Sequence, residues 1–239
     1  ENDMILDTFN FSMVSGSVEV TEGEMDLISA SNGLLENTPV VAMGVSVSLG
    51  GTFRFTGANA RVESGSSGSE VAFSGGNYHF ESDFTLETTH PGALINLGFN
   101  GGGNVFIPHF DGGTTSDPRE LIVSGPGSCD VFSPFTIPAN GVMRVNEGTS
   151  VEGANLGMLV RLPAGQVISS IGLLENNAIT SILSGGIAGH FTNKKKLKIV
   201  GLASPLNCDQ QGDLEQNENA EYANFTARSG SNHYPNGYT

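Results

Sequence analysis

Apolar and polar residues alternate in short runs between Thr52 and His109, and this pattern constrains the fold more than any other feature of the chain. Phe53 and Phe55 alternate with Arg54, and the same period of two recurs over 78–81 and 84–87. Successive side chains of a strand point to opposite faces, so each run has one buried and one solvated face. Turn sequences rich in Gly, Ser and Asn separate the runs. The pattern predicts an all-β protein.

The turn sequences are of the kind that joins neighbouring strands in hairpins. We therefore expect an antiparallel β-sandwich, jelly-roll-like, with at most one or two short helices. A β-solenoid is the alternative, although irregular spacing of the turns argues against it. With 239 residues, the chain fits a single β-domain over residues 1–239.

Two segments carry weaker signals for helix. Apolar residues between Val167 and Leu183 recur at steps of three and four, which is the stripe of an amphipathic helix. A helical turn is also expected within 26–37. Both predictions compete with the strand pattern of the rest of the chain.

The composition limits the classes of partner. A formal net charge of −15 with ten basic residues excludes nucleic acid and disfavours anionic membranes. No apolar run approaches the roughly 20 residues needed to span a bilayer. The sequence begins at Glu1 and shows no signal-peptide pattern. We expect a processed, secreted protein that acts outside the cell or at its surface. Abundant Gly and Ser and the absence of Trp are typical of extracellular structural or adhesive proteins.

Cys129 and Cys208 are the two cysteines of the chain. In an exported protein they are expected to form a disulfide, which would stabilise the fold by about 4 kcal/mol on the chain-entropy model. Two buried thiols are the alternative interpretation.

An acidic stretch follows Cys208, and its carboxylates suit calcium better than other metals. The candidate ligands are Asp209, Asp213, Glu215 and Glu218, with Asp111 and Asp117 as a second pair. Neither set has the spacing of an EF-hand loop. We therefore interpret the stretch as a solvated acidic loop, with no cofactor, and keep calcium as the alternative.

All four lysines lie close together, at Lys194, Lys195, Lys196 and Lys198. One interpretation is a solvated hairpin whose lysines protect a sheet edge from unwanted pairing. The other is a docking patch for the acidic surface of another copy, such as residues 209–221. The residues alone do not choose between them.

The first strand carries the main functional prediction. Its alternation places Ile5, Phe9, Phe11 and Met13 on one face, and a terminal strand this apolar must pair with a sheet. We expect it to add to an open sheet edge of the next subunit, as a donor strand does. Repetition of that head-to-tail contact would produce an open fibre. Segments 1–14 and 209–239 are thus predicted to dock on neighbouring subunits.

The sequence therefore favours a secreted structural subunit that self-assembles into a filament, sheath or surface layer, and not an enzyme. The sequence contains no nucleophile elbow and no close pair of histidines on one strand, so neither signal of catalysis or zinc binding is present. A carbohydrate-binding or adhesive module, with or without calcium, is the alternative, although the chain has few aromatic residues for sugar platforms. Asn10 and Asn224 each begin an N-glycosylation sequon.

Overall fold

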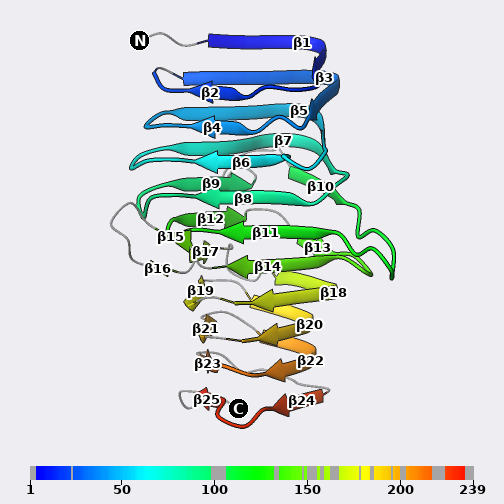
Figure 1. The fold of residues 1–239 in the computed structure, drawn as a ribbon, viewed down its shortest axis with the longest axis vertical. Coiled ribbons are helices and arrows are strands. Elements are labelled where there is room, and N and C mark those ends of the chain that lie inside the picture. Colours follow the sequence, from blue (N-terminus) through cyan, green and yellow to red (C-terminus); the bar gives the residue numbers. More distant parts are fainter. Residues whose placement is uncertain are drawn as a thin grey trace.

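The computed structural model is a two-sheet parallel β-solenoid, in which each coil of the chain adds one strand to each sheet (Figure 1). We call one such coil a rung. The structure describes residues 4–22, 24–97, 106–131, 135–146, 148–149, 155–156, 159–161, 167–177, 179–183, 186–194, 196–199, 203–216 and 224–234. The N-terminal rung lies at one end of the stack and the C-terminal rung at the other.

Two sheets run the length of the stack, and we call them sheet A and sheet B. Sheet A has the order β1 (Met4–Met13), β3 (Glu24–Glu36), β5 (Ser46–Thr56), β7 (Glu70–Phe80), β9 (Leu94–Leu97), β12 (Ser128–Val131), β17 (Leu159–Arg161), β19 (Ile179–Leu183), β21 (Lys196–Ile199), β23 (Asp213–Gln216) and β25 (Asn232–Tyr234), with β10 (Phe106–Phe110) also paired to β7. Sheet B has the order β2 (Val18–Val20), β4 (Val40–Ala42), β6 (Arg61–Ser64), β8 (Phe84–Thr88), β11 (Glu120–Ser124), β14 (Val142–Asn146), β18 (Val167–Asn176), β20 (Gly186–Asn193), β22 (Ala203–Gln210) and β24 (Asn224–Ala227), with β13 (Phe135–Ile137) also paired to β18. The small pair β15 (Gly148–Thr149) and β16 (Asn155–Leu156) is antiparallel.

The all-β prediction is confirmed, but the antiparallel sandwich is wrong, because every pairing within sheets A and B is parallel. The alternative, a β-solenoid, fits the structure. Alternation failed to distinguish the two because a strand with one buried and one solvated face has a period of two whatever the direction of its neighbours.

Both helix predictions are also wrong. The stripe from Val167 to Leu183 forms β18 and β19, and residues 26–37 lie mostly in β3. The described residues contain no helix. Steps of three and four arise in β18 because its pairing with β20 shifts register between Ser170 and Leu174, which interrupts the period of two.

The interior is built from columns of residues that stack in register from rung to rung. Val18, Val40 and Val62 stack at intervals of 22 residues in sheet B. Val47, Val71 and Ile95 stack at intervals of 24 in sheet A, and all three are fully buried. Rung length therefore changes along the chain, which is why the turns are irregularly spaced in the sequence.

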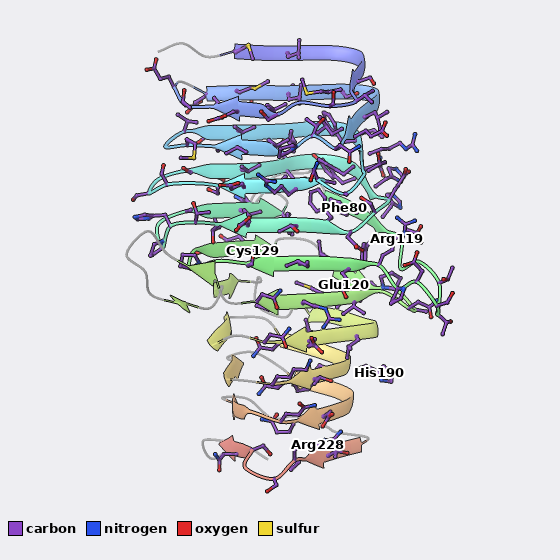
Figure 2. The ribbon with its side chains drawn as sticks, viewed as in Figure 1. Phe80, Arg119, Glu120, Cys129, His190 and Arg228 are labelled. Atoms are coloured by element: carbon purple, nitrogen blue, oxygen red, sulfur yellow. The ribbon has the colours of Figure 1, made fainter. Side chains whose placement is uncertain are left out.

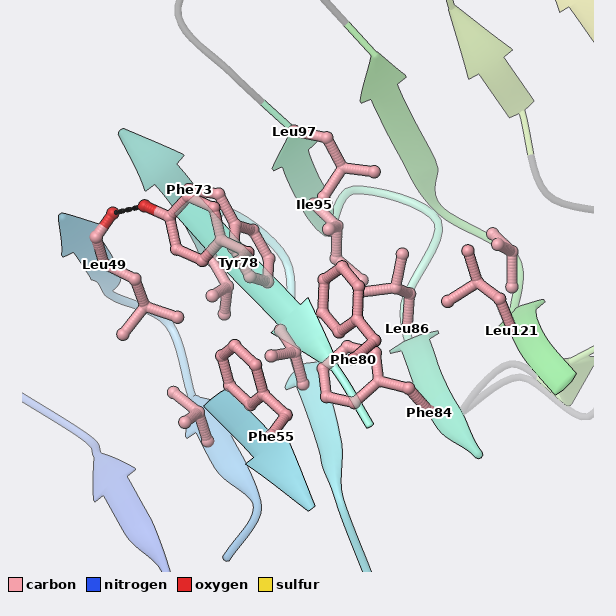
Figure 3. Close-up of a cluster of buried hydrophobic side chains, with 14 of the residues drawn as sticks. Leu49, Phe55, Phe73, Tyr78, Phe80, Phe84, Leu86, Ile95, Leu97 and Leu121 are labelled. Carbon is pink, nitrogen blue, oxygen red and sulfur yellow. Dashed lines mark hydrogen bonds between the residues drawn. The ribbon is translucent and has the colours of Figure 1, made fainter. Parts of the chain in front are cut away.

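Aromatic rings from both sheets pack together in the interior between β5, β7 and β8 (Figure 3). Phe55, Phe80 and Phe84 are buried, and the Phe84 ring centroid lies 4.9 Å from that of Phe55 and 4.5 Å from that of Phe80. Phe84 belongs to sheet B and the other two to sheet A, so these contacts join the sheets. The Tyr78 hydroxyl donates a hydrogen bond of 2.6 Å to the Leu49 carbonyl, and burial raises the pKa of this phenol.

Polar residues replace the apolar column in the narrow C-terminal rungs. Val145 of sheet B is followed in register by Asn176, Asn193 and Gln210, the last three at intervals of 17 residues. Asn176 and Asn193 are buried, and Asn176 Nδ2 donates to Asn193 Oδ1 at 2.8 Å. This hydrogen bond runs between neighbouring rungs and gives each of the two buried amides a partner, which lowers the cost of their burial.

The expected disulfide between Cys129 and Cys208 is not formed. Cys129 is buried on β12 of sheet A, whereas Cys208 lies on β22 of sheet B. At least three strand spacings of about 4.8 Å separate the two along the axis. That separation is too large for a disulfide, which needs Cα atoms within about 7 Å.

Glycines allow the bulges of sheet A to stack closely. The pairing of β5 with β7 shifts register after Leu49, and both Gly51 and Gly76 have positive φ, of 90° and 128°. A Cβ atom on Gly76 would lie 1.8 Å from the Gly51 carbonyl oxygen. Only glycine fits at this point of contact between rungs.

We expect Gly76→Ala to lower the free energy of unfolding by about 3 kcal/mol or more, because a left-handed alanine would also clash with the Gly51 backbone. Gly68→Ala is the matched control: Gly68 has a φ of 79° but open space at its Cβ position, so the loss should be about 1 kcal/mol. Urea unfolding followed by far-UV circular dichroism measures both. Equal losses in the two variants would show that the close contact does not matter.

Candidate functional site

The outer edge of the N-terminal rung is the first candidate site. β1 pairs in parallel with β3 from Met4 to Met13, and no other described strand pairs with it. β2 likewise pairs only with β4 among the described strands. The backbone donors and acceptors on the outer side of this rung are therefore available to another chain.

Apolar side chains accompany this edge. Ile5 is 68% exposed, Val14 56% and Met4 53%, the largest exposures among the large apolar side chains of the described part. A groove of about 490 Å³ opens beside them. It is lined on its apolar side by Met4, Leu6, Met13, Val18, Val20 and Met25, and on its rim by Glu19, Glu22 and Glu24. We call this surface the N-terminal edge.

The predicted interface residues of β1 do not share one face. Pairing with β3 shifts register between Thr8 and Asn10, so the faces exchange along the strand. Ile5 points outward, whereas Met13 lies opposite Leu35 and packs against the core. Phe9 and Phe11 lie on β1, and their side chains are outside the described residues.

A polar groove beside β10 is the second candidate site. It measures about 510 Å³ and is lined by His79, Glu81, His109, Phe110, Asp111 and Arg119. β10 pairs with the second half of β7, after β9 has paired with the first half, and this places His109 directly beside His79. Figure 2 shows Arg119 near the loop that protrudes from this side of the stack.

The two histidine rings of the polar groove are stacked, with centroids 4.4 Å apart and planes at 10°. His109 Nε2 lies 3.3 Å from Asn77 Oδ1. Burial, and then the neighbouring His109, lower the pKa of His79 below its ordinary value. Imidazole nitrogens can donate or accept hydrogen bonds, so the stacked pair offers polar contacts of both kinds to a ligand.

Ion pairs hold the groups around the two histidines. Arg54 donates from Nε and Nη2 to the Glu81 carboxylate at 2.8 and 2.6 Å. This bond is the main reason that the pKa of Glu81 is lowered. Arg119 Nε lies 3.6 Å from Asp111 Oδ2. The carboxylates of Glu81 and Asp111 in the groove are thus each balanced by an arginine, Arg54 or Arg119, an arrangement that suits a polar, uncharged ligand.

The sequence pattern did not predict the polar groove, because His79 and His109 are 30 residues apart and only the parallel register of β7 and β10 joins them. A signal was present. Each histidine precedes a phenylalanine, Phe80 or Phe110, and these two residues also pair in register. A repeated dipeptide of this kind is what neighbouring rungs of a solenoid produce.

The lysine cluster is divided by the structure. Lys194 Nζ binds Glu175 Oε2 at 2.6 Å, and Arg144 contacts the same carboxylate and also Glu120 Oε1, at 2.9 Å. Although burial would raise it, these bonds and charges keep the pKa of Glu175 below its ordinary value. Alternating charges thus run from β11 through β14 and β18 to Lys194, the residue after β20.

The remaining lysines do not protect an edge. β21 carries Lys196 and Lys198 between β19 and β23, so the edge interpretation is wrong. The register places Lys196 opposite Asp213 and Lys198 opposite Glu215. Lys195 lies outside the described residues. Docking of this cluster on another copy remains a prediction.

Of the acidic candidates for calcium, Asp209, Asp213 and Glu215 fall on strands, whereas Asp111 and Asp117 lie in the loop between β10 and β11. Asp209, on β22, accepts bonds of 2.7 and 2.8 Å from Arg228, which lower its pKa. Asp213 and Glu215 lie on β23, with side chains outside the described part, and Glu218 is itself outside it. Among the described residues, no three or more acidic, His or Cys side chains form a group able to hold a metal ion. Calcium binding at this stretch stays a prediction, as does use of the sequons at Asn10, on β1, and Asn224, on β24.

Comparison with known proteins adds no relative. The chain matches no family model, no curated protein and no solved structure. Within the described residues, no helix has the length and apolar character to cross a membrane.

We expect the stability of the fold to depend on pH through His79. Its pKa is lower in the folded protein than the ordinary 6.5, so the unfolded chain takes up the proton first as the pH falls. The free energy of unfolding should therefore decrease as the pH falls below about 6.5, and His79→Gln should reduce that decrease. Urea unfolding at several pH values measures the slope. An unchanged slope in His79→Gln would contradict the assignment.

Proposed function

We propose that this protein is a secreted structural subunit that self-associates through its N-terminal edge in an extracellular assembly such as a filament, sheath or surface layer. The observation that carries the proposal is the outer edge of β1, which is ten residues long, begins with the exposed Met4 and Ile5 and is followed by the exposed Val14. Edges of this length and apolar character are sites of pairing with another chain unless they are protected.

The mode of association follows from the state of β1. Its inner side is already paired with β3 of its own chain, so it need not be donated into a gap of a neighbour. It offers its outer side instead, and main-chain hydrogen bonds across that side would extend sheet A into a second chain. The apolar groove beneath it would be covered in the same step, which adds hydrophobic burial to the hydrogen bonds.

The body of the solenoid supports a structural role. Its columns of buried residues run through successive rungs, and the cluster around Phe55 joins the two sheets. The net charge of −15 would keep the sides of neighbouring rods apart, so that association is confined to the rod ends.

Self-association should weaken in an Ile5→Glu variant. Ile5 is 68% exposed, so the variant is expected to fold, but it places a further negative charge beside the three glutamates on the rim of the N-terminal edge. We expect the dissociation constant to rise at least about tenfold, which corresponds to about 1.4 kcal/mol. Sedimentation equilibrium measures it.

Ser116→Glu is the matched control, because Ser116 is exposed on the protruding loop and the variant makes the same change in charge. It should associate as the unmodified chain does. A chain that is monomeric at every concentration tested, or an Ile5→Glu variant that associates normally, would contradict the proposed function.

A second candidate function is carbohydrate binding in the polar groove, as an adhesive module. The favouring observation is the stacked pair His79 and His109 beside the Glu81 carboxylate, since sugar hydroxyls bind both imidazole nitrogens and carboxylates. Glu81→Gln should lower the affinity for a glycan identified on an array by about tenfold, because a charge-assisted hydrogen bond is lost. Glu63→Gln, on sheet B, is the control. Absence of any glycan signal would contradict this function.

A further inference from the structure

The rungs at the two ends of the solenoid differ in length. At the N-terminal end β1 has ten residues, whereas β25, the last strand of sheet A, has three among the described residues, which stop at Tyr234. The intervals between stacked residues also decrease, from 22 in the first rungs to 17 in the last ones of sheet B. The taper is visible in Figure 1.

This difference in length disfavours head-to-tail stacking. A second copy stacked head to tail would place a rung that repeats every 17 residues in sheet B on one that repeats every 22, so its shorter rung would leave part of the outer side of β1 without partners. The apolar groove would also be covered only in part. Head-to-tail stacking would therefore leave part of the N-terminal edge, both backbone groups and apolar side chains, exposed to water.

Head-to-head stacking uses the whole surface. A twofold axis along the sheet normal sets β1 antiparallel to β1 of the second copy and, in the same operation, β2 antiparallel to β2. Strand lengths then match by symmetry. Pairing of the full strand brings Met4 of one copy opposite Met13 of the other, so the two apolar grooves close on each other. From this match we propose that the partner of the N-terminal edge is the N-terminal edge of a second copy, in a twofold dimer.

This inference rests on the proposed function, in which the N-terminal edge is the interface, and adds its polarity. Such a contact is isologous and closes on itself, so it cannot alone produce a fibre. The unit of any larger assembly would be the dimer, with the two narrow C-terminal ends pointing outward.

The symmetric contact has an electrostatic signature. Glu19, Glu22 and Glu24 are exposed on the rim of the groove, and a head-to-head dimer brings both sets together. Salt screens repulsion between like charges, so the dimer should tighten as ionic strength increases. We expect the dissociation constant to fall several-fold between about 50 mM and 0.5 M sodium chloride, and Glu22→Gln to reduce this dependence.

Electron microscopy of the full chain with a C-terminal hexahistidine tag and nickel–gold particles tests the polarity directly. The expected particle is a rod of two copies with gold at both outer ends. Gold at a single spacing along a chain of rods would overturn the head-to-head inference and leave the proposed self-association standing. Rods of one copy at every protein concentration would overturn both. A dissociation constant that rises with salt would also overturn the head-to-head contact, because it would indicate opposite charges across the interface.

Discussion

Every feature of this protein depends on parallel pairing in register between one rung and the next. The pairing satisfies the backbone of each strand on both sides and places like residues above one another, as Val47, Val71 and Ile95 show. An interior rung therefore needs nothing outside the chain. The first and last rungs lack one neighbour each among the described strands, so unsatisfied backbone groups gather at the two ends. Function that depends on association is thus directed to the ends by the fold itself.

Local patterning predicted which residues face inward, but not how the strands are connected. Phe53 and Phe55 are fully buried and Arg54 is exposed, as the alternation indicates. The relative direction of a strand depends on the strand with which it pairs, about 22 residues away in the sequence. A repeat that would reveal this pairing is hard to see, because the interval between stacked residues changes from 22 to 24 and then to 17. The helix predicted from Val167 failed for a related reason, since a register shift in β18 imitates a helical period.

The candidate sites were predicted only where they depend on a single strand. Exposure of Ile5 at a terminal edge follows from one apolar strand, although the register shift after Thr8 turns Met13 to the core. The polar groove depends on the neighbours of its strands: His79 and His109 meet because β10 takes a place beside β7 that β9 leaves open. No local spacing contains that information. The same limit applies to Cys129 and Cys208, whose assignment to different sheets depends on the rungs between them.

The taper also explains why the two ends differ in their need for a partner. Narrow rungs have less interior to fill, and in sheet B their column contains Asn176, Asn193 and Gln210, which form hydrogen bonds within the chain, and ends at the small side chain of Ala227. Exposure of such a column to water costs little, because amides are hydrated as readily as they are paired. The wide end instead presents methionine, leucine and valine side chains to solvent in the groove beneath β1. Burial of that groove yields free energy only where apolar surface is removed from water. Among the described residues, the apolar surface that association would remove from water therefore lies at the N-terminal edge, whichever chain would cover it.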